Sequence, residues 1–202
     1  MNKSVAIVTG ASQGIGRSTA IRLAKDFGAV ALVARNGDAL VEVADVVRAT
    51  GAEPLSIALD LSRVESPGTV LKTTLDRYGR VDALLNIAGA VPQIDLFEMT
   101  DQQWCGGMEL KRHRGCRLAI HAWEALKARK GSVVFMSGTA ALDPKPGFAA
   151  VAATNAAITA MAKAFAGQPE EIAELLAFMV SPAAKWMTGS SVRMDGGEVK
   201  GV

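Results

Sequence analysis

Residues 5–16 read Val5-Ala6-Ile7-Val8-Thr9-Gly10-Ala11-Ser12-Gln13-Gly14-Ile15-Gly16, and this stretch decides the fold. Its first half is rich in β-branched residues, as a buried strand is, and its second half carries three glycines before an amphipathic segment begins. A strand that turns directly into a helix points several backbone N–H groups at one spot, near the positive end of the helix dipole. Glycine permits the tight turn and lets a phosphate approach closely. The stretch therefore predicts a nucleotide-binding loop formed by Gly10, Ser12, Gln13, Gly14, Ile15 and Gly16.

Short apolar runs alternate with longer amphipathic stretches along the rest of the chain. After the first strand at 5–9, we expect buried strands at residues 29–34, 55–59, 81–87 and 132–137, and a short last strand at 191–194. Helices are expected at residues 14–27, 37–50, 64–78, 101–130, 148–166 and 170–180. This alternation predicts an α/β fold: a three-layer, doubly wound parallel sheet of the Rossmann type. No repeat or linker interrupts it, so residues 1–202 are expected to form a single domain.

The composition excludes several classes of protein. Half of the 202 residues are hydrophobic and 21% are charged, which is neither a disordered nor a fibrous composition. The net charge of +2 argues against nucleic acid or a membrane surface as the main partner. Cys105 and Cys116 form neither a disulfide framework nor a metal-ligand spacing. There is no signal peptide and no apolar run long enough to span a membrane, so we expect a cytoplasmic protein without a metal.

Further motifs follow the later strands. Asp60-Leu61 comes after the third strand, Asn86-Ile87-Ala88-Gly89 after the fourth, Pro146-Gly147 before the helix at 148–166, and Thr188-Gly189 and Asp195-Gly196-Gly197 near the end. Together with the glycine loop, these motifs make the chain resemble the short-chain dehydrogenase/reductase family over essentially its whole length. The resemblance implies an oxidoreductase that uses NAD(H) or NADP(H).

In that family the counterpart of Asp60 contacts the adenine ring, and the stretch after the fourth strand lines the cofactor site. Both segments follow parallel strands, and open α/β sheets bind ligands at the carboxyl ends of such strands. The further cofactor-binding residues expected on this basis are Asp60, Leu61, Asn86, Ala88 and Gly89. For Asn86 a second interpretation stays open, in which its buried side chain ties neighbouring strands together.

The end of the second strand bears on the choice of cofactor. An acidic side chain there would accept hydrogen bonds from the ribose hydroxyls of NAD, but the position holds Ala34, and Arg35 follows. A guanidinium beside the ribose suits a 2′-phosphate, which it can bind bidentately, and Arg17 is a second candidate cation. We therefore expect NADP(H) in preference to NAD(H). The alternative is that Arg35 stacks on the adenine or caps the next helix.

The resemblance implies a catalytic tetrad that this chain lacks. In the family a Tyr and a Lys lie four residues apart on the helix after the fifth strand, with a Ser at the end of that strand and an Asn on the helix before it. Here the Tyr, Lys, Ser and Asn positions hold Val151, Asn155, Gly138 and Lys111. No catalytic residue is therefore predicted.

Neighbouring residues offer weak substitutes. Strand alternation turns Ser137 to the opposite face from Gly138 unless the strand ends irregularly, and Tyr78, the only tyrosine, lies before the fourth strand. Asp143 and Lys145 follow the fifth strand and are candidates for the pocket mouth. The basic run at 111–117, which includes His113, is better interpreted as a solvated or inter-subunit face.

The chain is also shorter than the family, whose members run to about 250 residues. Ala166 passes directly to Gly167, without the strand, the Pro-Gly turn and the substrate lid that the family carries there. Either this segment is deleted, or the sequence joins two stretches across a segment that it omits. The continuous sequence favours a deletion, whereas the last strand would then lose its neighbour, which favours the second interpretation.

Three functions remain open. The first is an NADP(H)-dependent oxidoreductase, and the second is a nucleotide-binding protein without redox turnover that acts as a sensor, a scaffold or a partner subunit. The third is an enzyme that uses the pocket for non-redox chemistry. We also expect a homo-dimer or homo-tetramer, because two helices carry more apolar surface than one sheet face covers. The residues concerned are Leu118, Ala119, Ala122, Leu126, Ala153, Ala157, Ile158 and Ala160.

Overall fold

The computed structural model describes residues 4–89, 94–95, 97–108, 114–143 and 147–162. The chain divides into two compact units, Met1–Ile158 and Thr159–Val202. All the elements below lie in the first unit, except that the last turn of one helix extends into the second. The single domain expected over residues 1–202 stays a prediction, because only residues 159–162 of the second unit are described.

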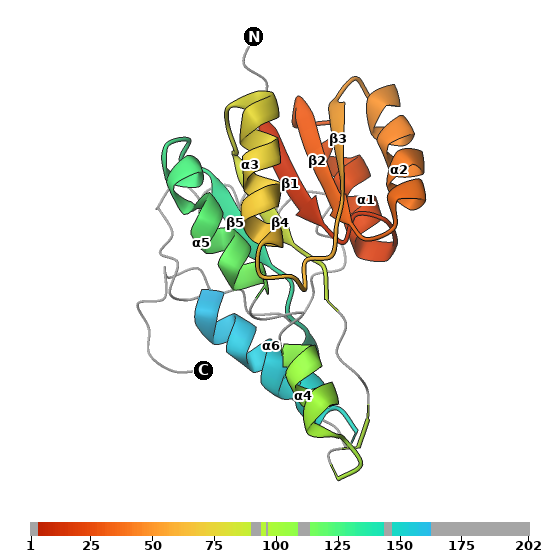
Figure 1. The fold of residues 1–202 in the computed structure, drawn as a ribbon, viewed down its shortest axis with the longest axis vertical. Helices are drawn as coiled ribbons and strands as arrows, with labels where there is room; N and C mark the ends of the chain where they lie inside the picture. Colours follow the sequence, from red (N-terminus) through yellow and green to blue (C-terminus); the bar gives the residue numbers. More distant parts are fainter. Residues whose placement is uncertain (1–3, 90–93, 96, 109–113, 144–146, 163–202) are drawn as a thin grey trace, which may run out of the picture. The chain divides into compact units, whose positions relative to one another are not determined.

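Five parallel strands form one sheet in the order β3-β2-β1-β4-β5 (Figure 1). They are β1 (Val5–Thr9), β2 (Ala29–Ala34), β3 (Glu53–Ala58), β4 (Ala83–Asn86) and β5 (Ser132–Phe135). Ile7 lies opposite Ala31 on one side and Leu84 on the other. The strand order reverses between β1 and β4, and a crevice opens at such a point at the carboxyl ends of the strands. The predicted doubly wound parallel sheet is confirmed.

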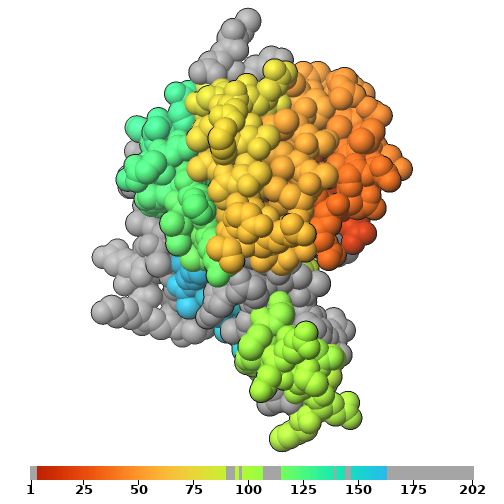
Figure 2. All heavy atoms as spheres, in the orientation of Figure 1, coloured from red at the N-terminus to blue at the C-terminus, as the bar shows by residue number. Residues whose placement is uncertain are grey.

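Helices cover both faces of this sheet. Those between the strands are α1 (Gly14–Leu23), α2 (Gly37–Ala49), α3 (Ser66–Tyr78) and α5 (Arg114–Lys127). Helix α1 packs against α2, and α3 packs against α5. Figure 1 shows α3 and α5 in front of the sheet, and the space-filling view of Figure 2 shows their yellow and green atoms on the same face. The predicted three layers are therefore present.

Two more helices are described, α4 (Asp101–Met108) and α6 (Ala149–Ala162), with a 3₁₀ turn at Thr139–Ala141. The sequence predicted one helix over 101–130, and α4 and α5 occupy the two ends of that range, with residues 109–113 outside the described part. The helix expected at 170–180 and the strand expected at 191–194 also lie outside the described residues.

One part of the core lies between the sheet and the pair α1–α2. All of β1 is buried, and Leu32 of β2 packs with Leu40, Val43 and Val47 of α2. The outer strands β3 and β5 are only partly buried, so the expectation of buried strands was wrong for these two. Each has a single neighbouring strand among the described residues, because each lies at an edge of this sheet.

The apolar face of α5 is covered by the chain itself. Its buried side chains are Leu118, Ala119, Ala122 and Leu126, and each is at most 1% exposed. The expectation that these side chains remain for a subunit contact was therefore wrong. Packing against α3 and the sheet accounts for them.

Candidate functional site

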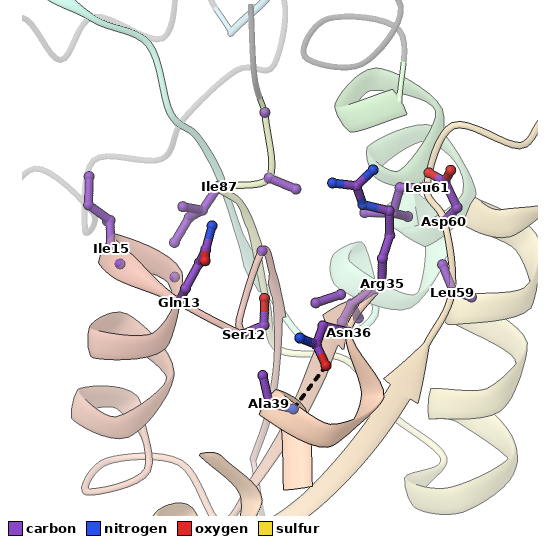
Figure 3. Close-up of a pocket in the computed structure, with 17 residues that line it drawn as sticks. Ser12, Gln13, Ile15, Arg35, Asn36, Ala39, Leu59, Asp60, Leu61 and Ile87 are labelled. Atoms are coloured by element: carbon purple, nitrogen blue, oxygen red, sulfur yellow. Dashed lines mark hydrogen bonds between the residues drawn. The ribbon is translucent and has the colours of Figure 1, made fainter. Parts of the chain in front are cut away.

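A cavity of about 750 Å³ opens at the carboxyl ends of the central strands (Figure 3). Four segments line it: the loop after β1 with the start of α1, and the ends of β2, β3 and β4. Among the lining residues are Gly10, Ser12, Gln13, Gly14, Ile15, Gly16, Arg35, Asp60, Leu61, Ala88 and Gly89. These are all the predicted cofactor-binding residues except Asn86. Residues separated by more than seventy positions in the sequence are thus brought together as the topology predicts.

Two glycines explain why the first loop has its shape. Gly10 adopts a φ of +70°, and a Cβ atom there would lie 3.0 Å from the Cα of Ala88. A Cβ atom on Gly16 would lie 2.1 Å from the carbonyl oxygen of Gly10, which no side chain tolerates. Helix α1 therefore begins directly against the loop, with its first N–H groups at the cavity. Gln13 gives this helix no side-chain cap and its first turn holds no acidic residue, so these donors suit an anionic group.

Thr9 positions the opposite side of the cavity, and sequence reasoning missed it. Its buried hydroxyl donates to the carbonyl oxygen of Leu85 at 3.2 Å and accepts from the backbone N–H groups of Ile87 at 2.9 Å and Ala88 at 3.0 Å. The side chain thereby fixes the chain as it leaves β4 and enters the cavity lining. The sequence did offer a signal for this role, since Thr9 is a hydroxyl residue at the end of an otherwise apolar strand. A hydroxyl that is buried there needs hydrogen-bond partners.

The end of β2 presents a cation to the cavity. Arg35 is exposed and makes no hydrogen bond or ion pair with another described residue, and Figure 3 shows its guanidinium on the side of Asp60 and Leu61. The N-cap of α2 is Asn36, whose Oδ1 accepts from the backbone N–H of Ala39 at 3.1 Å. Arg35 is therefore not the cap that the alternative interpretation assigned to it. Arg17 is exposed on α1 and is not among the described residues that line the cavity.

Asp60 at the end of β3 is held in place by its own loop. Its Oδ1 accepts from the backbone N–H of Ser62 at 2.8 Å, and its carbonyl oxygen accepts from Ser66 Oγ at 2.6 Å. The carboxylate is thus oriented before any ligand arrives, next to a cation and an apolar wall that includes Leu61.

Asn86 lies beside the cavity rather than in its lining. The residue is 8% exposed, and a Cβ atom on Gly115 of α5 would lie 3.4 Å from the Asn86 Cγ. Its Nδ2 has no hydrogen-bond partner within the described part of the chain. Nδ2 therefore ties Asn86 to no other strand among the described residues, and a cofactor contact by Asn86 stays a prediction.

The described tetrad positions lie at the end of β5 and on α6. A Cβ atom on Gly138 would lie 2.9 Å from Nδ2 of Asn155, a residue only 2% exposed. Val151 is half-buried one turn earlier on α6, and Lys111 lies outside the described residues. The Asn155 side chain thus occupies space that a side chain at position 138 would need.

Ser137 also turns toward α6, where its Oγ donates to the backbone carbonyl of Asn155 at 3.0 Å. Strand β5 ends at Phe135 and a 3₁₀ turn follows, so strand alternation does not extend to residue 137. The strand end is irregular, and the expected opposite orientation of Ser137 was wrong for this reason.

The two other described candidates for an acid, Tyr78 and Asp143, are not among the residues that line the cavity. Tyr78 ends α3. Its hydroxyl donates at 3.3 Å to the carbonyl oxygen of Glu53, the first residue of β3, so it lies at the amino end of that strand, whereas the cavity lies at the carboxyl ends. Burial raises the pKa of Tyr78, so it is a weaker acid than usual. Asp143 is exposed and is not among the described lining residues, and Lys145 and His113 lie outside the described part.

The described residues show neither a metal site nor a membrane-spanning helix. They contain no cluster of three His, Cys, Asp or Glu side chains that could hold a metal ion. None of their helices is long and apolar enough to cross a membrane.

Comparison with known proteins agrees with the fold. A 3-oxoacyl-[acyl-carrier-protein] reductase of Synechocystis is 27% identical over 243 aligned positions, which cover 98% of each chain. An alcohol dehydrogenase of Thermococcus sibiricus, solved with 5-hydroxy-NADP, is 30% identical with a TM-score of 0.76 over 80% of this chain and 69% of its own. An NAD⁺-bound xylitol dehydrogenase shares the fold at 24% identity, with a TM-score of 0.76 over 85% of this chain and 65% of its own.

The alignment to the Synechocystis reductase also measures how short this chain is. Its 243 positions exceed the 202 residues by 41, so at least 41 positions of that reductase have no counterpart here. The missing positions agree with the absence of a family segment from this sequence; that they lie after Ala166, and that they are a deletion, stay open. The short chain dehydrogenase family model matches residues 4–174, most of the chain. On this match, and with the sheet and glycine loop already described, the chain belongs to the short-chain dehydrogenase family.

Proposed function

We propose that the chain binds a nicotinamide dinucleotide in the cavity and prefers NADP(H) to NAD(H). The loop after β1 fits a pyrophosphate, because it combines N–H donors at the start of α1 with open space above Gly14, where a Cβ atom would meet nothing within 4 Å. The related Thermococcus enzyme was solved with an NADP derivative, which supports the same class of ligand.

The observation that carries the preference is the pair Ala34 and Arg35 at the cavity. No carboxylate at position 34 is present to accept from a ribose diol, and the exposed Arg35 guanidinium matches a 2′-phosphate. One such charge-assisted contact contributes about 1.5–3 kcal/mol, or one to two orders of magnitude in affinity.

Calorimetric titration with NADP⁺ and with NAD⁺ tests this preference. We expect tighter binding of NADP⁺, and we expect Arg35→Ala to weaken NADP⁺ binding about tenfold or more while leaving NAD⁺ binding nearly unchanged. Arg17→Ala is the matched control, because it removes an exposed cation that does not line the described cavity. Equal or tighter binding of NAD⁺ to the unmodified protein would contradict the proposal.

We further propose that ordinary carbonyl–alcohol turnover is absent or very slow. Val151 has no proton to give, Asn155 carries no charge, and Gly138 offers no hydroxyl. Positioned proton transfer contributes about 10²–10⁴-fold to rate, and the single tyrosine lies at the other edge of the sheet. A role as a sensor, a scaffold or a partner of an active relative would need only the bound nucleotide and a protein surface.

An absorbance assay with NADPH and a panel of simple ketones and aldehydes tests this second proposal. We expect rates well below about 1 s⁻¹, the low end for enzymes. Val151→Tyr alone should add little, because tetrad members act as a unit. Gly138→Ser has to accompany Asn155→Lys, since the two positions share one space, and Val151→Tyr with Lys111→Asn completes the set. Turnover above that rate by the unmodified protein would overturn the proposal and direct attention to Lys111, Asp143 and Lys145.

A further inference from the structure

We propose that Asn36 is a site of spontaneous deamidation, and that the carboxylate formed there opposes the binding of a 2′-phosphate in the cavity. The first half of this proposal involves only the protein and water. The second half rests on the proposed function, because it concerns which dinucleotide the cavity accepts.

The sequence and the exposure of its side chain set Asn36 apart from the other asparagines. The chain has four, and only Asn36 precedes a glycine; Asn2, Asn86 and Asn155 each precede a residue that carries a side chain. A glycine has no Cβ to shield the backbone nitrogen between the two residues, and it lets that nitrogen turn toward the asparagine side chain. Asn36 is exposed, whereas Asn86 and Asn155 are buried.

The start of α2 brings the reacting groups into one turn. Gly37 is the first residue of the helix, so its N–H has no partner within the helix. Asn36 Oδ1 accepts from the backbone N–H of Ala39 at 3.1 Å, and Figure 3 shows this bond across the first turn. Attack on Asn36 Cγ places negative charge on that oxygen, which the Ala39 N–H and the positive end of the helix dipole stabilise.

The cap hydrogen bond restrains Asn36 but does not lock it. No other side-chain hydrogen bond of Asn36 is present among the described residues. A bond of this kind lowers the population of the free side chain by about two- to thirtyfold. The side chain therefore still reaches the orientation in which Cγ meets the Gly37 nitrogen.

The reaction consumes water and releases ammonia. The Gly37 nitrogen loses its proton and bonds to Asn36 Cγ, while the bond from Cγ to Nδ2 breaks and ammonia leaves. Water then opens the cyclic imide at one of its two carbonyls, which gives aspartate or isoaspartate. Aspartate caps a helix as well as asparagine does, so this product leaves α2 in place.

Either product adds a negative charge at position 36. Asn36 lines the cavity next to Arg35. A carboxylate there repels a 2′-phosphate and competes for the guanidinium that would bind it. It can also accept hydrogen bonds from the hydroxyls of an unphosphorylated ribose. The preference for NADP(H) should therefore decline as the protein ages.

Mass spectrometry on the full chain tests the modification. Trypsin cuts after Arg35 and Arg48 and releases residues 36–48, in which Asn36 is the only asparagine. After storage of the folded protein in warm, mildly alkaline buffer, we expect this peptide to show the mass gain from –NH₂ to –OH well before the peptides with Asn86 and Asn155. A gain no faster than in those peptides would overturn the proposal.

Gly37→Ala is the matched control variant, because it keeps Asn36 and its cap. A Cβ atom at position 37 would meet the Ala58 Cβ at 3.5 Å, an ordinary contact, and alanine favours a helix. We expect deamidation to be slower by about tenfold or more, since the added Cβ shields the nitrogen and restricts its motion. Equal rates in the variant and the unmodified protein would also overturn the proposal.

Calorimetry on two further variants tests the effect of the charge. Asn36→Asp and Asn36→Ser both keep a helix cap, and only the first adds a charge. We expect Asn36→Asp to bind NADP⁺ about tenfold more weakly than Asn36→Ser, and NAD⁺ at least as tightly. Equal affinities of the two variants for NADP⁺ would overturn the second half of the proposal.

Failure of the proposed function looks different. In that case the unmodified protein binds neither dinucleotide, or binds NAD⁺ as tightly as NADP⁺, and the second half of the proposal falls with it. The mass gain of residues 36–48 still decides the first half, because the chemistry at Asn36 depends on no ligand.

Discussion

At the scale of single residues, Thr9 connects the fold to the site. Replacing it with Val removes a buried hydroxyl that serves the N–H groups of Ile87 and Ala88 and the carbonyl of Leu85. Leaving such groups unpaired costs about 1–3 kcal/mol, so Thr9→Val should lower the free energy of unfolding by that amount and weaken NADP⁺ binding. Thr9→Ser keeps the hydroxyl and should behave nearly as the unmodified protein in denaturant titration and calorimetry. Unchanged stability and affinity in Thr9→Val would contradict this role.

Single residues also show which parts of the site could be predicted from the sequence and which could not. The glycines and Arg35 could be placed at the cavity because their roles depend on the local turn and on strand ends. The orientations of Asn86 and Ser137 could not, because they depend on where β4 meets α5 and where β5 stops pairing. These are tertiary contacts, and no periodicity in the sequence encodes them.

At the scale of elements, Asp82 joins the starts of three strands at the edge opposite the cavity. Its carboxylate accepts from the backbone N–H of Val5 and from Arg80 Nε, both at 2.8 Å, and its carbonyl accepts from the N–H of Ser132. Burial alone would raise the pKa of Asp82, but the hydrogen bonds from Arg80 and Val5 and the charges of Arg80 and Arg129 outweigh it and lower the pKa. The ionised carboxylate therefore stabilises the folded state.

A prediction about pH follows from this lowered pKa. The stability that Asp82 contributes is fully present above the pKa of an unfolded aspartate, about 3.9, and is lost as the pH falls through the lower folded pKa. Asp82→Asn should reduce the free energy of unfolding at pH 7 by about 1.5–3 kcal/mol, and this deficit should shrink below pH 4. Asp76→Asn, which breaks an exposed ion pair with Lys72, is the control and should change little. A deficit that stays constant from pH 7 to pH 3 would contradict the prediction.

Element boundaries were less predictable than the elements themselves. The bounds of β1 and β2 agree with the expected strands, because both lie inside the sheet and are nearly all apolar. Strand β3 begins earlier than expected, at Glu53, and includes Pro54. An edge strand tolerates proline because one side of its ladder has no partner, and that position was not evident before the strand order was known.

At the scale of the whole molecule, the strand–helix alternation sufficed to predict a parallel sheet and the edge of it that holds the cavity, but not the order of the strands. It did not predict which apolar helix faces remain exposed, because that depends on how α3 and α5 pack. The side chains expected to form a subunit contact on α5 are core residues, and a different face of the same helix is left uncovered among the described residues.

That face bears on the prediction of a homo-dimer or homo-tetramer. Ile120 is 62% exposed on α5, and the half-buried Cys116 and Trp123 lie on the same side of the helix at spacings of four and three residues. Light scattering at micromolar concentration should give at least twice the 21.1 kDa of one chain, and Ile120→Lys should lower that mass toward one chain. Val41→Lys is the matched control, because Val41 is 57% exposed on α2, away from this face. A mass of one chain for the unmodified protein would rule out the oligomer. If Ile120→Lys leaves the mass of the oligomer unchanged, the contact between subunits lies on another surface.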